Sequence, residues 1–157
     1  MRNIILLYIA LIMASASGCS RHGAVDAILD RADSLIAIAT AYYADRPDSP
    51  ELMRSLFYQA TVYYNAERYG RAAVDATHAY EIAVKLDDPF WTGKTSDKIA
   101  DIFNKTYNYD ECIKFRKIAV TSYAKIRKRN FYQWALLELS NDYINSGNLR
   151  NDQSLIP

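Results

Sequence analysis

Apolar residues recur at spacings of three and four through most of the chain, a pattern that predicts amphipathic helices. Short polar segments containing Pro, Asp or Gly separate the periodic stretches and are typical of turns. Ser49-Pro50 and Asp88-Pro89 have the residue types of an N-cap followed by a first helical residue. The expected helices span residues 24–44, 50–66, 71–86, 90–106, 110–126 and 130–146. The pattern therefore predicts an all-α fold of about six helices.

The helical pattern repeats after 40 residues, and residues 56–89 form the centre of the repeat. Small residues fall on small ones and aromatic residues on aromatic ones: Ala60 on Ala100, Tyr63 on Phe103, Tyr69 on Tyr109, Ala72 on Cys112 and Ala79 on Ala119. Leu136, Leu139, Ser140 and Tyr143 give a third copy of the first helix only. A fixed period of this size indicates stacked helical pairs.

The first residues have the pattern of an export signal. Arg2 precedes ten apolar residues, 4–13, a run too short to span a bilayer as a helix. Small residues occupy positions 14–18, and Cys19 follows directly. Two interpretations remain open: a secretory signal with a chance cysteine, or a signal in which the cysteine itself is modified.

Composition narrows the class of protein. A chain of 157 residues suits one domain with a continuous core. Lys plus Arg number 19 and Asp plus Glu 18, a balance that gives no reason to expect nucleic-acid binding. The two cysteines, Cys19 and Cys112, are too few for a disulfide framework.

The N-terminal segment resembles the signal of bacterial lipoproteins, with the relaxed sequence before the cysteine that is typical of the Bacteroidetes. The resemblance implies that residues 1–18 are a signal peptide, that Cys19 is acylated, and that residues 19–23 are a lipidated tether. It also implies a location in the bacterial cell envelope. By the signals that sort such lipoproteins, the resemblance further implies the outer membrane, with the domain facing the periplasm, since neither an Asp nor an acidic cluster follows Cys19.

The helix pairs resemble the tetratricopeptide repeat. The positions that carry the likeness are Leu56, Gln59, Ala60, Tyr63, Ala72, Ala76, Ala79 and Pro89, and then Ser96, Ile99, Ala100, Phe103, Cys112, Arg116 and Ala119. The period of 40 exceeds the usual 34, so each pair is about one turn longer. The resemblance implies a right-handed solenoid of antiparallel helix pairs over residues 24–148, followed by a tail at 149–157.

In such repeats the first helix of each pair lines the concave face, and this implies a groove. Carrying the family's groove positions over residue by residue gives Arg54, Phe57, Thr61, Tyr64, Asn65, Lys94, Asp97, Asp101, Asn104, Lys105, Trp134 and Asn141, with Leu137, Ile144 and Asn145 beside them. The mixture of amide, cationic and aromatic residues suits an extended peptide or a protein segment. The expected function is non-enzymatic: a lipid-anchored scaffold that binds a partner in this groove.

Two alternatives concern the end of the repeat. The helix at 130–146 presents Phe131, Trp134, Leu137 and Ile144, which would leave an apolar face uncovered at the end of a stack. This face suggests self-association or a partner. The same observation is compatible with a truncated periplasmic sensor domain of a Bacteroidetes signalling protein.

The sequence contains no motif for a cofactor, a metal or a catalytic nucleophile. Asp97 and Asp101 lie one turn apart, a spacing that suits paired catalytic carboxylates but also a solvated helix face. Cys112 occupies a small-residue position and is expected to be a buried structural thiol, although Arg116 four residues on could activate it. His78 has no second His or Cys to pair with and is expected to be structural and partly buried.

A run without acidic residues separates Glu111 from Glu138. Its cations are Lys114, Arg116, Lys117, Lys125, Arg127, Lys128 and Arg129. Such a run is typical of a solvated helix face, and it would also suit anionic lipid headgroups or an acidic partner.

Overall fold

The computed structural model describes residues 21–147 of the chain. Within them six α-helices follow one another, and this part of the chain has no strand. The helices are α2 (Arg21–Tyr43), α3 (Pro50–Asn65), α4 (Tyr69–Lys85), α5 (Pro89–Lys105), α6 (Tyr109–Lys125) and α7 (Arg129–Ser146). The predicted all-α fold is confirmed, and the predicted boundaries differ from these by at most three residues.

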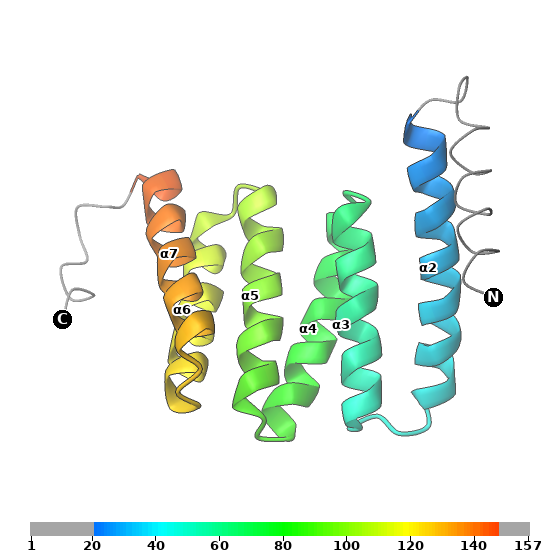
Figure 1. Cartoon of the computed structure of the whole chain (residues 1–157), viewed down its shortest axis with the longest axis horizontal. Helices are drawn as coiled ribbons and strands as arrows, with labels where there is room; N and C mark the ends of the chain where they lie inside the picture. Colours follow the sequence, from blue (N-terminus) through cyan, green and yellow to red (C-terminus); the bar gives the residue numbers. More distant parts are fainter. Residues whose placement is uncertain (1–20, 148–157) are drawn as a thin grey trace, which may run out of the picture.

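The helices stand side by side in a row and run alternately up and down (Figure 1). Each packs mainly on its neighbours in the sequence, and α3 also touches α5. The first helices of the pairs, α3, α5 and α7, therefore form one layer, and α4 and α6 lie behind it (Figure 1). This layer is the surface on which the groove was predicted.

The turns between helices explain the 40-residue period. Each of the four turns that join α3 to α7 contains one residue with a positive φ angle, and these residues recur every 20 positions: Glu67, Asp87, Tyr107 and Arg127. After α3, the amide of Arg68 donates to the Tyr63 carbonyl at 2.8 Å and that of Glu67 to the Tyr64 carbonyl at 3.0 Å. This is the Schellman arrangement, which satisfies the last carbonyls of a helix and normally uses Gly at the left-handed position. The turns after α4 and α5 have the same hydrogen bonds.

The predicted helix starts are confirmed at α3 and α5. The Ser49 hydroxyl accepts a hydrogen bond from the Leu52 amide at 3.2 Å. One Asp88 carboxylate oxygen accepts from the amides of Phe90 and Trp91, each at 3.0 Å. Both caps satisfy amides that have no partner inside the helix, and a proline follows each cap as the first helical residue.

The core consists of three apolar clusters along the row of helices. The small residues matched by the 40-residue step are fully buried where helices approach closely: Ala60, Ala72, Ala79, Ala100, Cys112 and Ala119. Gly93 marks an especially close contact between α5 and α6, because an added Cβ would lie 2.6 Å from the Tyr123 ring. The repeat read from the sequence therefore corresponds to the packing of successive helices.

Several expectations about single positions are wrong. Leu35, expected on the buried stripe of the first helix, is 70% exposed, because only α3 among the described helices packs on α2. His78 is exposed, since the buried face of α4 is made by its alanines and Ile82. Ser140 is exposed although its counterparts Ala60 and Ala100 are buried, because no described helix covers that side of α7.

The expected signal peptide, Cys19 and the tail at 149–157 lie outside the described residues. Of the tether expected at 19–23, residues 21–23 already belong to α2, because that helix begins at Arg21. Among the described helices, none combines the length and the apolar character that crossing a bilayer requires.

Candidate functional site

Two adjoining cavities open on the layer formed by α3, α5 and α7. The polar cavity, about 370 Å³, is lined by Tyr64, Asp101, Asn104, Lys105, Arg116, Glu138, Asn141, Ile144 and Asn145. The aromatic cavity, about 530 Å³, is lined by Phe57, Lys94, Asp97, Lys98, Asp101, Tyr123, Asn130, Phe131 and Trp134. Because Asp101 lines both, the two cavities adjoin, and together they are here called the groove.

Most of the groove residues predicted from the sequence line these cavities. They are Phe57, Tyr64, Lys94, Asp97, Asp101, Asn104, Lys105, Trp134 and Asn141, with Ile144 and Asn145 beside them. Arg54, Thr61, Asn65 and Leu137 line neither. The Arg54 guanidinium lies over the Trp91 ring at 5.8 Å, and the Thr61 hydroxyl donates to the Phe57 carbonyl at 2.9 Å.

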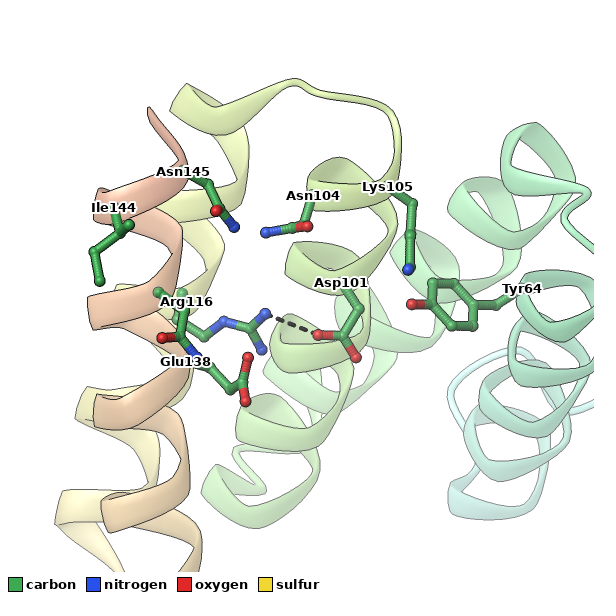
Figure 2. A pocket seen from close by; sticks show the side chains of 9 residues that line it. Tyr64, Asp101, Asn104, Lys105, Arg116, Glu138, Ile144 and Asn145 are labelled. Carbon is green, nitrogen blue, oxygen red and sulfur yellow. Dashed lines mark hydrogen bonds and ion pairs between the residues drawn. The ribbon is translucent and has the colours of Figure 1, made fainter. Parts of the chain in front are cut away.

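A buried arginine joins the helices that form the groove. The Arg116 side chain on α6 is only 2% exposed, and its guanidinium donates to three carboxylates. Nε donates to Asp142 at 2.9 Å and Nη2 to Asp101 at 2.8 Å (Figure 2 shows the second bond), while Nη1 donates to Asp97. These four residues, here the Arg116 cluster, fix α5, α6 and α7 relative to one another, because α5 carries Asp97 and Asp101 and α7 carries Asp142.

The Arg116 cluster has more negative than positive charge. One guanidinium and three carboxylates give a formal sum of −2. Burial raises the pKa of Asp97; Arg116 opposes this, whereas Asp101 and Glu138 add to it. Burial and then the nearby Asp101 raise the pKa of Tyr64, and burial and then Asp97 raise that of Tyr123. Burial lowers the pKa of Arg116, but Asp101 and Asp97 outweigh it and the net shift is upward, so Arg116 stays charged.

This geometry corrects two interpretations of the sequence. Asp97 and Asp101 were interpreted as a solvated helix face, but both carboxylates bind Arg116. Arg116 was included in an exposed basic run, but it is buried, because the repeat places it where the previous pair has the buried Ala76. A guanidinium buried at this position needs carboxylate partners to offset its desolvation.

Lysines and aromatic rings are paired along the groove. The Lys94 ammonium lies 5.1 Å from the centre of the Phe57 ring and 5.3 Å from that of Trp91. The Lys98 ammonium lies 4.6 Å from the centre of the Tyr64 ring and 4.0 Å from an Asp101 oxygen. Each cation–π contact contributes about 0.5–1 kcal/mol at such partly exposed sites. The groove therefore presents cations whose positions are already restricted.

Side-chain amides occupy the polar end of the groove. The Asn104 amide donates to Asp142 at 2.8 Å, so it supports the Arg116 cluster. Asn141 and Asn145 lie along the opposite wall, on α7, and Asn145 extends toward Asn104 (Figure 2). An amide side chain both donates and accepts, which suits the backbone of an extended peptide.

Two chemical features considered from the sequence, a reactive thiol and a metal site, can be examined in the described residues. Cys112 is buried and unpaired, as the sequence predicted, and burial followed by a hydrogen bond to Asp142 raises the pKa of its thiol to about 12. Because the thiolate is the reactive form, this thiol is unreactive near neutral pH. Nowhere in residues 21–147 do three His, Cys, Asp or Glu side chains group closely enough to hold a metal ion.

Several groove residues were missed in the sequence. Lys98 and Glu138 lie one helical turn after the predicted Lys94 and Trp134 and are themselves 40 residues apart, so the repeat contains the signal for both. Asp142 lies 40 residues after the buried Ile102. A charged residue at each of two inward repeat positions, 116 and 142, was a detectable sign of a buried ion pair.

No protein-family model matches the chain, and no curated protein matches it. The function proposed below therefore depends on the groove and its contacts.

Proposed function

We propose that this chain is a non-enzymatic binding module, a right-handed solenoid resembling tetratricopeptide repeats, that holds an extended segment of a partner protein in the groove of α3, α5 and α7. The observation that supports it most is the pairing of two kinds of cavity: a polar cavity with amides adjoins an aromatic cavity with lysines, and Asp101 lines both. An extended peptide needs both kinds of contact, amides for its backbone and apolar cavities for its side chains.

The contacts between the groove helices support a preorganised binding site. The Arg116 cluster holds α5 and α7, two of the groove walls, through buried charged hydrogen bonds. A wall fixed before the ligand arrives lowers the entropic cost of binding.

A displayed peptide library panned against the purified chain tests this proposal. Binding of the enriched peptides would be measured by calorimetry for the parent, for an Asn141→Ala/Asn145→Ala variant, and for Gln133→Ala as a matched control. Gln133 is an exposed amide on the same helix that lines neither cavity. Each lost amide bond weakens binding by about fivefold, or roughly 1 kcal/mol. The double variant should therefore bind roughly 25-fold more weakly, and the control should bind like the parent. Failure to enrich any peptide, or equal binding by all three proteins, would refute the proposal.

The proposed location is the bacterial cell envelope, with Cys19 lipid-anchored and the domain facing the periplasm. The support is the sequence of residues 1–19. Growth of cells expressing the chain with labelled palmitate should label the parent but not Cys19→Ser. Equal labelling of the two proteins would contradict lipidation at this residue.

A second candidate is the sensor domain of a signalling protein, in which α7 packs on a further element. It is favoured by Leu137, which is 55% exposed on α7 and lines neither cavity. The same face would serve self-association. Sedimentation at increasing protein concentration distinguishes self-association from packing on another element. Self-association that Leu137→Gln abolishes would indicate contact between copies of the chain. A monomer at every concentration would contradict self-association through this face.

A further inference from the structure

The turn between α6 and α7 concentrates positive charge. Lys125, Arg127, Lys128 and Arg129, here the basic turn, are all exposed. No ion pair joins any of them to a carboxylate of residues 21–147. The three other cations of the run have separate roles: Lys114 pairs with Glu111 at 2.9 Å, Arg116 is buried in its cluster, and the Lys117 ammonium lies 5.5 Å from the centre of the Tyr143 ring. The basic turn is therefore a local patch whose charge its described neighbours leave unneutralised.

Aromatic and apolar surface adjoins the basic turn. A cavity of about 380 Å³ is lined by Tyr123, Ala124 and Tyr132, together with Arg127 and Arg129. Farther into α7, Trp134 contributes to the aromatic cavity and still leaves 58% of its surface exposed. Because successive helix residues point about 100° apart, Tyr132 and Trp134 face different directions around the start of α7. Tyr132 and Trp134 are thus accessible rings at this end of α7, whereas Tyr123 is buried.

We propose that the basic turn and the aromatic start of α7 bind the surface of an anionic lipid bilayer. Anionic headgroups attract Lys and Arg, and each cation close to the surface strengthens binding by roughly fivefold. Tryptophan and tyrosine settle at the boundary between headgroups and acyl chains, where one part of the ring is apolar and the other wet.

The position of the basic turn makes this contact distinct from the proposed lipid anchor. The start of α2 and the α6–α7 turn lie at opposite ends of the helices and at opposite ends of the row (Figure 1). Attachment through Cys19 would therefore not bring the basic turn to a bilayer by itself, and the contact requires its own affinity.

Trp134 provides a direct probe of this end of the protein. The chain has two tryptophans, so in a Trp91→Phe variant of the full chain Trp134 is the single fluorophore. Its emission would be recorded with vesicles of pure phosphatidylcholine and with vesicles of equal parts phosphatidylcholine and phosphatidylglycerol, with and without brominated acyl chains. Residues 4–13 are apolar and would attach the chain to either vesicle, but only contact at the basic turn places Trp134 within reach of the bromine quencher.

Two further variants in the Trp91→Phe background separate local charge from total charge. Arg127→Gln/Lys128→Gln/Arg129→Gln removes three cations of the basic turn. Arg46→Gln/Arg68→Gln/Arg71→Gln removes three exposed cations from other turns and from α4. Circular dichroism of each variant is the check that it remains folded. Raising the salt concentration tests the same interaction without substitution, since screening weakens it.

The proposal expects a blue shift and bromine quenching of Trp134 with the anionic vesicles only. The response should need at least about tenfold more lipid in the basic-turn variant, follow the parent in the control variant, and decline with salt. An equal response to both vesicle types, no quenching, or a basic-turn variant that behaves like the control would overturn it. A Trp134 response to soluble polyglutamate without any response to vesicles would also overturn it, in favour of an acidic protein partner.

Discussion

Replacing Arg116 with methionine tests the Arg116 cluster most directly. Methionine keeps much of the side-chain volume but removes the guanidinium, so Asp97, Asp101 and Asp142 lose their common partner. Asp142, at 1% exposed, can gain no water in exchange, whereas Asp97 and Asp101 are 20% and 36% exposed and are partly solvated. Most of the cost therefore comes from Asp142. Breaking one buried pair in this way typically lowers the free energy of unfolding by about 3–5 kcal/mol.

Lys114→Met is the matched control. Lys114 lies two residues earlier on the same helix and pairs with Glu111 at 2.9 Å, but both side chains are exposed. An exposed pair contributes about 0–1 kcal/mol. The assay is urea unfolding followed by far-ultraviolet circular dichroism. The free energy of unfolding must fall with urea concentration at the same slope in all variants. A changed slope would indicate that the helical repeat unfolds in parts, and the free energies could then not be compared.

The loss should also depend on pH. Burial already raises the pKa of Asp97, and Arg116 opposes that shift, so removing Arg116 raises the pKa further. A carboxyl whose pKa is higher in the folded than in the unfolded chain loses stability as the pH rises from its usual value near 3.8 through its folded value. The deficit of Arg116→Met should therefore be smaller in acid than at neutral pH. A deficit within 1 kcal/mol of that of Lys114→Met at neutral pH would contradict the energetic role assigned to the cluster.

Three further predictions concern the helices and their turns. Gly93→Ala should destabilise the fold by about 1–3 kcal/mol, because the added Cβ would lie 2.6 Å from the Tyr123 ring. Gly70→Ala is the control: it has open space around it and should be neutral or stabilising by up to about 1 kcal/mol. Thermal unfolding measures both variants, and equal effects would contradict the close contact at Gly93. Asp87→Gly should raise the free energy of unfolding by about 0.5–1 kcal/mol, since Asp87 has φ 49° and Gly adopts this conformation without strain. As a control, Glu81→Gly inside α4 should lower it by about 1 kcal/mol. A loss of stability in Asp87→Gly would show that the turn is not strained. In a Cys19→Ser chain, Cys112 should react with a thiol reagent at pH 8 only after urea unfolding, because its pKa is raised to about 12 and its side chain is buried; rapid reaction of the folded chain would contradict this.

The sequence alone determined the helices, their caps and the order in which they stack. These depend on contacts within one or two turns, so spacing and cap residues suffice to predict them: Ser49 and Asp88 cap helices as expected. The 40-residue step also identified the buried small residues, because a position in the repeat fixes which side of a helix faces its neighbours. The resemblance to tetratricopeptide repeats, carried over position by position, indicated most of the predicted residues that line the two cavities.

Only the tertiary structure decided which charged residues meet. Arg116 binds partners 15, 19 and 26 residues away, on two other helices. Helical periodicity gives the face on which a charge lies, but not its distance from a charge on another helix, because that distance depends on the packing of the helices between them. Charge alone does not separate the buried Arg116 from the exposed Arg127 and Arg129, and the repeat shows only that position 116 faces inward. Packing decided that difference: it surrounds Arg116 with three carboxylates and leaves the basic turn without a described carboxylate partner.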